Sequence, residues 1–237
     1  MHDVTPWDHL LALFAGLVLP LGGALLQRGR EASREPWTSR DRIAMYWTNS
    51  AVLALLAGAT LLVWHLGGHS PSTLGLTAEP RRLDVGLGGA ALFLALYAFD
   101  SLRQIGPARL AQTRRRWRRD TPFMPTTPRE LGHSLVMITS AAVFEEIVYR
   151  GFLISYAAQF TGATPLGLAA AVILPALVFG LGHLYQGWRA GGKIVFLAGF
   201  LGAIFVLTGS LWIPMALHFV ADLVGFLLGP RLLGDEQ

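Results

Sequence analysis

Residues 166–185 read LGLAAAVILPALVFGLGHLY and contain no aspartate, glutamate, lysine or arginine. About 20 such residues are enough for an α-helix to cross the hydrocarbon core of a bilayer. The whole chain has the same character, because 53% of its 237 residues are hydrophobic and only 14% are charged. Soluble domains carry about 25% charged residues. The sequence therefore predicts an all-α integral membrane protein and excludes an ordinary soluble domain.

Similar apolar stretches lie on both sides of this one and together predict a polytopic bundle of about seven transmembrane helices. Counts of six and eight remain alternatives, because the sixth stretch is short and lies close to the seventh. The predicted spans are residues 9–26, 43–66, 83–102, 131–160, 166–185, 194–207 and 211–228.

Basic residues are concentrated in every second loop between these spans. Positive charge gathers in cytoplasmic loops, so the pattern predicts a cell-membrane protein with its N-terminus outside and its C-terminus in the cytoplasm. Residues 109–120 are expected to form a basic helix on anionic lipid, which makes a nucleic-acid partner unnecessary. The basic residues of these loops and of the C-terminal end are Arg28, Arg30, Arg34, Arg40, Arg42, Arg103, Arg109, Arg114, Arg115, Arg116, Arg118, Arg119, Arg129, Arg189, Lys193 and Arg231.

Ionisable residues inside predicted spans are the candidates for function, because charge in hydrocarbon is costly and seldom kept without a role. The chain has no cysteine, which excludes disulfides, thiolate metal sites and a cysteine nucleophile. The candidates, in chain order, are Glu145, Glu146, Arg150, His183, His218 and Asp222.

The two glutamates of the span 131–160 are expected to have different tasks. Glu146 and Arg150 are four residues apart, which places them on one face of an α-helix as an ion pair. Glu145 points about 100° away, so it is free to face a cavity and to act as a base. The alternative is that all three side chains form a buried ionic clamp between helices.

The histidines complete the pattern. His218 and Asp222 lie one turn apart, so the acid can orient the imidazole, or both can join a metal shell. The alternative is a hydrogen-bonded pair that locks two helices together. His183, taken alone, is more often a structural residue near a helix end. Counted along their spans, however, these residues and Glu145 reach the same depth, which predicts a polar cavity open to the cytoplasm.

Three motifs carry a family resemblance: Glu145-Glu146-x-x-x-Arg150, Phe179-x-x-x-His183 and His218-x-x-x-Asp222. In order and spacing they resemble the motifs of the CPBP intramembrane proteases, which include type II CAAX prenyl endopeptidases and bacterial Abi proteins. The resemblance covers residues 128–230. It implies a catalytic core in residues 128–237, preceded by N-terminal transmembrane helices and a basic cytoplasmic loop in residues 1–127.

The resemblance also implies an activity, namely hydrolysis of a peptide bond by an intramembrane endopeptidase in a cytoplasm-facing cavity. Glu145 would be the general base that activates water, and Glu146 paired with Arg150 would support it. His183 would hold the water or the oxyanion. The implied partners are membrane lipids and a membrane-associated or C-terminal peptide or protein tail, with a lipid-modified tail as one option.

His218 and Asp222 would stabilise the oxyanion. Members of the family more often have asparagine at the last motif position. Asp222 departs from this pattern, and its carboxylate cannot fill a role that needs an amide N–H donor. The preferred interpretation has no metal and no other cofactor. Its alternative is a zinc site with His183, His218 and Asp222 as ligands, in line with the metalloprotease label often given to the family. Rival functions are a non-catalytic scaffold or immunity protein and a proton-coupled carrier that titrates Glu145 and Glu146.

Overall fold

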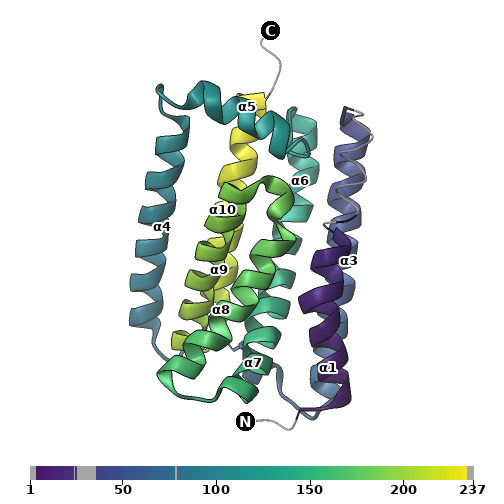
Figure 1. Cartoon of the computed structure of the whole chain (residues 1–237), viewed down its shortest axis with the longest axis vertical. Coiled ribbons are helices and arrows are strands. Elements are labelled where there is room, and N and C mark those ends of the chain that lie inside the picture. The colour runs from purple at the N-terminus through teal and green to yellow at the C-terminus, as the bar shows by residue number, and fades with distance from the viewer. Residues whose placement is uncertain (1–3, 24, 26–35, 78, 234–237) are drawn as a thin grey trace.

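The computed structural model describes residues 4–23, 25, 36–77 and 79–233. Over these residues the chain forms helices and no β-strand, which confirms the predicted all-α class. The long helices stand side by side as a bundle, and a short helix lies across one end (Figure 1). The elements are α1 Pro6–Leu13, the π-helix η1 Phe14–Val18, α3 Ser39–Leu66, the 3-10 helix η2 Pro71–Leu74, α4 Leu83–Ile105, α5 Leu110–Asp120, α6 Pro128–Ser140, the π-helix η3 Ala141–Leu153, α7 Ile154–Thr161, α8 Pro165–Gly182, the 3-10 helix η4 Leu184–Gln186, α9 Trp188–Thr208 and α10 Trp212–Leu233.

Six helices within the described residues are long and apolar enough to cross a membrane, which confirms a multi-pass protein but not the count of seven. The predicted first span, residues 9–26, is helical through α1 and η1, and its end lies partly outside the described residues. The six candidate spans are Ser39–Leu66, Leu83–Ile105, Pro128–Thr161, Pro165–Gly182, Trp188–Thr208 and Trp212–Leu233.

The sixth predicted span starts too late in the sequence. In the structure α9 begins at Trp188, well before residue 194. The predicted start is late because the charges of Arg189 and Lys193 favour a loop. Lys193 is instead accommodated on the helix by an ion pair with Asp100 of α4, with its Nζ 2.6 Å from the Asp100 Oδ2. The end of α9 is set by Gly209, whose φ of 68° is left-handed and suits a residue without a β-carbon.

Large apolar side chains cover the outside of the bundle as well as its core. The core is built around buried residues such as Trp64, Phe152 and Phe179. On the outside, Leu55 and Leu166 are largely exposed, as are many other leucines and phenylalanines. An apolar surface of this extent marks contact with a membrane or another protein, and on spanning helices it fits contact with lipid.

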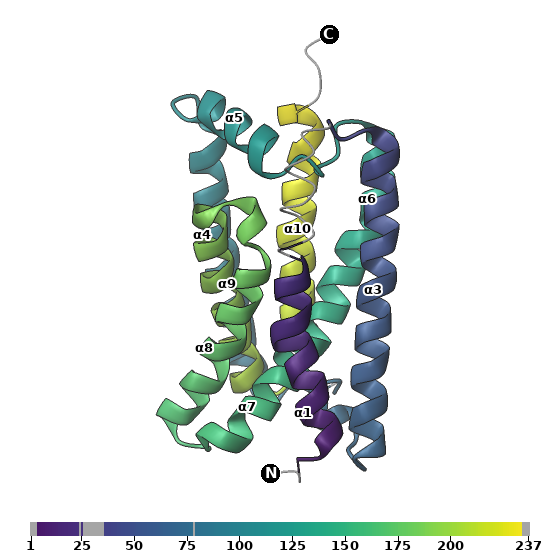
Figure 2. The same ribbon diagram turned by 45° about the vertical axis from the view of Figure 1, so that its right-hand side comes forward.

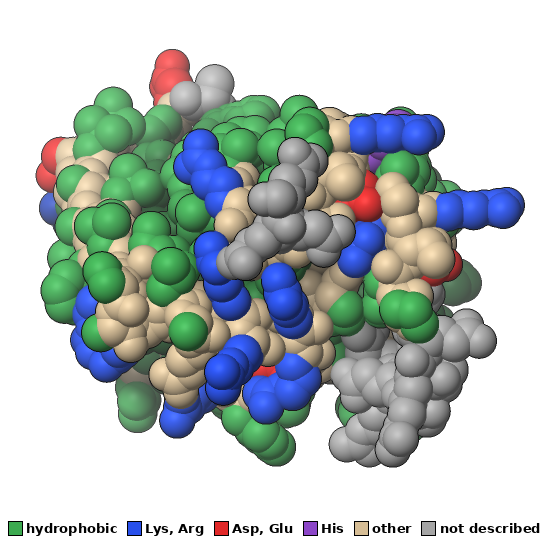
Figure 3. Space-filling model, turned by 90° about the horizontal axis from the view of Figure 1, so that it is seen from above, with side chains coloured by type: hydrophobic (Ala, Val, Ile, Leu, Met, Phe, Trp, Pro, Cys, Tyr) green, Lys and Arg blue, Asp and Glu red, His purple; other side chains and the backbone are tan. Residues whose placement is uncertain are grey.

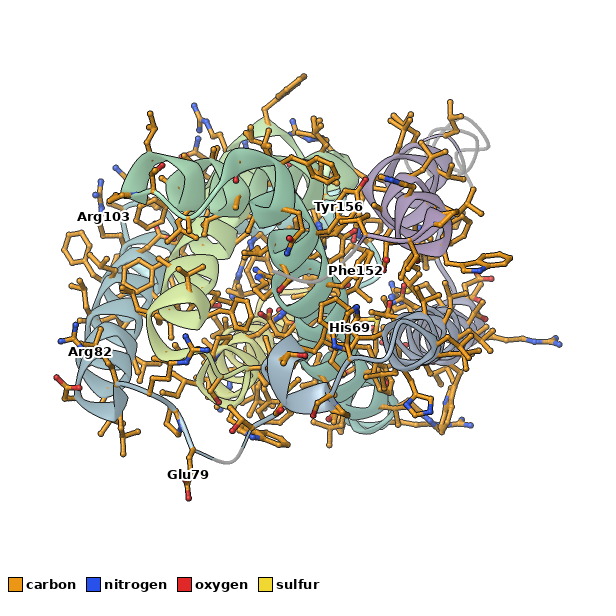
Figure 4. All side chains as sticks on the ribbon, turned by 90° about the horizontal axis from the view of Figure 1, so that it is seen from below. His69, Glu79, Arg82, Arg103, Phe152 and Tyr156 are labelled. Carbon is orange, nitrogen blue, oxygen red and sulfur yellow. The ribbon has the colours of Figure 1, made fainter. Side chains whose placement is uncertain are left out.

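The helices that precede residue 128 are built into the same bundle. The helix α3 packs along α6 and η3, and α4 packs on α9 and α10. The first helix is fixed by a hydrogen bond between the His9 Nδ1 and the Tyr156 hydroxyl at 2.7 Å. Tyr156 stacks in turn on Phe152, and both are labelled in the view from below (Figure 4). The division of the chain at residue 127 stays a prediction.

The two ends of the bundle differ. The helix α5 and the end of α10 lie at one end of the bundle, and the start of α1 lies at the other (Figure 1). Lys and Arg side chains gather on the α5 end (Figure 3). At the opposite end, Glu79 and Arg82 lie at the periphery (Figure 4). The predicted basic helix is confirmed as α5, whereas Arg28, Arg30 and Arg34 lie outside the described residues.

The turn between α8 and α9 is recessed. It stops short of the level that α4 and α10 reach at the α5 end of the bundle (Figures 1 and 2). His183 follows directly after α8 and begins this turn. The turn therefore holds His183 below the outermost level of the bundle, where it can meet residues from the middle of η3 and α10.

Candidate active site

The first motif lies on the π-helix η3, which joins α6 and α7 into one continuous segment. A π-helix bonds each N–H to the carbonyl five residues earlier and is rare, occurring often at functional sites. At the end of η3 the N–H of Ile154 bonds to the carbonyl of Tyr149, in keeping with this pattern. The α-helical geometry predicted for Glu145 and Glu146 is therefore wrong here, because each turn of η3 is wider.

The predicted ion pair nevertheless forms inside the wider helix. The Arg150 Nη1 is 2.9 Å from the Glu146 Oε1, and the two side chains are 3% and 0% exposed. The contact is short but not aligned as a hydrogen bond, and among the described residues the Arg150 Nη1 and the Glu146 Oε2 have no hydrogen-bond partner. Charge attraction thus holds the pair, helped by the Phe179 ring 4.8 Å from the Arg150 Cζ.

His218 on α10 connects the two glutamates to the third motif. Its Nδ1–H donates to the Glu146 Oε1 at 2.7 Å. Its Nε2 lies 3.8 Å from the Glu145 Oε2 and 3.6 Å from the Asp222 Oδ2. The imidazole is therefore surrounded by three carboxylates. Glu146 is hydrogen-bonded to it, whereas Glu145 and Asp222 lie slightly beyond hydrogen-bonding distance.

His183 of the second motif is held by the end of α8. Its Nδ1 lies 2.7 Å from the carbonyl oxygen of Phe179, one of the last carbonyls of that helix. A carbonyl oxygen only accepts hydrogen bonds, so the Nδ1 carries the proton. A neutral His183 then presents a lone pair on its Nε2, which can accept a hydrogen bond from water.

The Phe179 ring brings the three motifs together. Its centroid is 4.5 Å from that of His183 and 6.2 Å from that of His218. It also packs edge-on against Tyr149 at 4.8 Å and receives the guanidinium of Arg150. Arg150, His183 and His218 thus lie around one aromatic side chain. The three predicted carboxylates join the same cluster through His218.

Exposure within the cluster increases in one direction. The Glu146 side chain is fully buried, His218 and Glu145 are 12% and 13% exposed, and Asp222 is 33% exposed. The exposed fraction of the side chains therefore rises from Glu146 through His218 and Glu145 to Asp222.

Tyr185, which no motif in the sequence indicates, lies beside the site in the recessed turn. Its ring is stacked 6.0 Å from that of His183. Burial, and then the nearby charges of Glu145 and Asp222, raises the pKa of Tyr185 to about 12, so the hydroxyl stays protonated and can donate. The one available signal was an aromatic residue two positions after a histidine that ends a helix.

A zinc ion at this cluster would need three or four protein ligands. Within the described ranges no group of three or more histidine, aspartate and glutamate side chains is placed to hold a metal. The zinc ligand set predicted as the alternative is therefore not assembled in this arrangement. The Nδ1 atoms of His183 and His218 bond to protein oxygens, so these residues could hold a metal only through their Nε2 atoms.

Three carboxylates, two histidines and one arginine from the three motifs thus lie in one cluster inside the bundle. Residues 127–224 match the sequence model of a family described as type II CAAX prenyl endopeptidase Rce1-like. This stretch contains all six predicted residues, and the match confirms the family resemblance. At the level of the family it supports a membrane protease. Comparison with curated proteins and with solved structures gave no match.

Proposed function

We propose that this protein is an intramembrane endopeptidase that hydrolyses a peptide bond in a membrane-associated or C-terminal peptide. The observation that carries the proposal is the unequal use of the two adjacent glutamates. Glu146 is fully buried and is occupied by Arg150 and His218. Glu145 is partly exposed and has only the longer contact to the His218 Nε2. Glu145 is thus the carboxylate that remains available to a substrate.

In the proposed reaction Glu145 takes a proton from a water molecule, and the oxygen of that water attacks the scissile carbonyl carbon. His183 accepts a hydrogen bond from the same water through its Nε2. The C–N bond then breaks, and Glu145 passes the proton to the leaving nitrogen. One water is consumed, and the products are a carboxylic acid and an amine.

The oxyanion of this reaction needs a donor, and His218 is placed to supply it. Its Nδ1–H is fixed by Glu146, which orients the ring. Three carboxylates surround the ring and stabilise a form that carries both N–H groups. The Tyr185 hydroxyl offers a second donor at the edge of the site.

The positive-inside rule supports a cytoplasmic opening for the site. The basic α5 end of the bundle carries the recessed turn with His183 (Figures 1 and 3). With that end in the cytoplasm, the C-terminus is cytoplasmic and the N-terminus is outside. A substrate tail would then enter from the cytoplasmic side.

Cleavage by the purified full-length chain in detergent tests the proposal. A library of quenched fluorescent peptides is expected to be cleaved at the same rate before and after treatment with a chelator, since protein groups alone supply the base and the oxyanion donor. Loss of cleavage on chelation, restored by added Zn²⁺, would overturn the metal-free mechanism. A folded, monodisperse protein that cleaves none of the peptides, nor any membrane-protein tail offered to it, would contradict the protease proposal and favour a binding role.

The substitution Asp222→Asn is expected to keep kcat/KM near the wild-type value. The amide has the same shape, leaves Glu145 and Glu146 to stabilise the form of His218 that carries both N–H groups, and adds an N–H where the oxyanion develops. If the carboxylate were a metal ligand or were needed to keep His218 charged, kcat/KM would fall by roughly tenfold or more. Asp222→Leu, which removes both the charge and the hydrogen-bonding group, serves as the matched control and is expected to lose activity in the same peptide assay.

A further inference from the structure

A cavity lies outside the cluster around Phe179. It has a volume of about 480 Å³ and is formed between α5 and the turn that leads into α9. Cavities of this size hold small molecules or headgroups. It opens at the basic end of the bundle seen in Figure 3. Its polar lining includes Arg115, Arg116, Arg119, Asp120, Gln186 and Arg189.

The cavity has an excess of positive charge. Four arginines and one aspartate line it, which gives the lining a formal charge of +3. Asp120 forms an ion pair with its neighbour Arg119, whose Nε lies 2.6 Å from the Asp120 Oδ1. Arg116 donates a hydrogen bond to the Gln104 Oε1 at 2.5 Å. Among the described residues, Arg115 and Arg189 form no ion pair. Two guanidinium groups are therefore left to bind an anion.

The start of α9 adds to this charge. The helix begins at Trp188 after Gly187, and no side chain caps its first N–H groups. Gly187, Trp188, Arg189 and Ala190 all line the cavity. The free N–H groups and the positive end of the helix dipole favour an anion at this position. This feature is independent of the arginines and points to the same kind of ligand.

The level of the cavity relative to the candidate membrane spans indicates the source of the anion. Trp188 is 82% exposed and starts one of the candidate membrane spans. Tryptophan is enriched at the level of the lipid headgroups, and basic pockets at the ends of transmembrane helices bind anionic headgroups. We propose that this cavity binds the phosphate group of an anionic lipid headgroup, held by Arg115, Arg189 and the start of α9.

Lipid binding to the full-length protein in detergent, counted by native mass spectrometry, tests the proposal. Short-chain phosphatidylglycerol and phosphatidylcholine with the same acyl chains are titrated separately. The double variant Arg115→Gln/Arg189→Gln is compared with Arg109→Gln/Arg118→Gln, which removes the same charge from exposed positions of the same region outside the cavity. Asp120→Asn removes the one negative charge of the lining.

We expect wild type to bind phosphatidylglycerol more tightly than phosphatidylcholine. The cavity variant should lose roughly tenfold or more of this affinity, the control should keep it, and Asp120→Asn should gain affinity. Competition by inorganic phosphate would support recognition of the phosphate group itself. All the variants change exposed or isosteric groups, and size-exclusion chromatography checks their folding.

Four results would overturn the proposal. An equal loss in both double variants would show that binding follows total charge rather than this cavity. Equal affinity for the two lipids would show that the headgroup charge is not recognised. Binding of inorganic phosphate without phosphatidylglycerol would replace the lipid by a soluble anion. Displacement of lipid only by a peptide with a free C-terminal carboxylate would assign the cavity to a peptide.

Discussion

Replacing Glu145 with glutamine is expected to lower kcat for peptide cleavage by about 10²–10⁴-fold. The amide cannot take a proton from water but has the same shape as the carboxylate. The Glu145 side chain is partly exposed and contacts only the His218 Nε2, at 3.8 Å, among the charged groups. Its replacement should therefore leave the fold intact, with KM nearly unchanged. Initial rates over a range of peptide concentrations separate the two constants.

The neighbouring glutamate provides the matched control for this experiment. Glu146→Gln keeps the shape but weakens the pairing with both Arg150 and His218. It should lower the thermal stability as well as the rate, whereas Glu145→Gln should lower the rate alone. Full activity of Glu145→Gln would contradict the assignment of Glu145 as the base. An inactive Glu146→Gln with wild-type thermal stability would instead assign the base to Glu146.

Replacing Arg150 with methionine is expected to cost about 3–5 kcal/mol of unfolding free energy, the range for breaking one partner of a buried ion pair. Methionine fills much of the same space but removes the guanidinium beside the fully buried Glu146, which then keeps only His218 as a charged partner among the described residues. It also removes the charge that lies over the Phe179 ring. The unfolding free energy is measured by denaturant titration of the detergent-solubilised protein.

A second buried pair in the same protein gives the comparison for Arg150→Met. Arg42 lies 3.4 Å from Glu130, whose side chain is 1% exposed. Glu130 also accepts hydrogen bonds from the backbone N–H and the hydroxyl of Thr126, so Arg42→Met should cost less. If the two variants lost equal unfolding free energy, Glu146 would depend on Arg150 no more than Glu130 depends on Arg42.

The candidate residues could be predicted because charge is rare in apolar spans. Glu145, Glu146 and Arg150 interrupt a long apolar stretch, and the four-residue spacing of His218 and Asp222 survives in α10 as a contact of 3.6 Å. The wide turn of η3 could not be predicted, since residues 141–153 have no proline or other local signal that distinguishes a π-helix from an α-helix. Backbone hydrogen bonding there is decided by packing.

Other features depend on contacts between distant segments. The early start of α9 depends on Asp100 of another helix, which neutralises Lys193. The position of Tyr185 at the candidate site depends on the folding of η4 beside Glu145 and Asp222. Neither relation leaves a periodic pattern in the sequence. The first span was correctly expected to begin as a helix, but residues 24 and 26 at its end lie outside the described part of the chain.

The recessed turn between α8 and α9 (Figure 2) also makes the bundle shorter on one side. A bilayer adapts to a short hydrophobic length by thinning, at a cost of about a fraction of a kcal/mol per Å. We expect water and headgroups to reach further toward His183 on this flank. For the proposed protease, a peptide tail that approaches along it would then cross less hydrocarbon. The desolvation barrier for a polar substrate would fall before any side chain touches it.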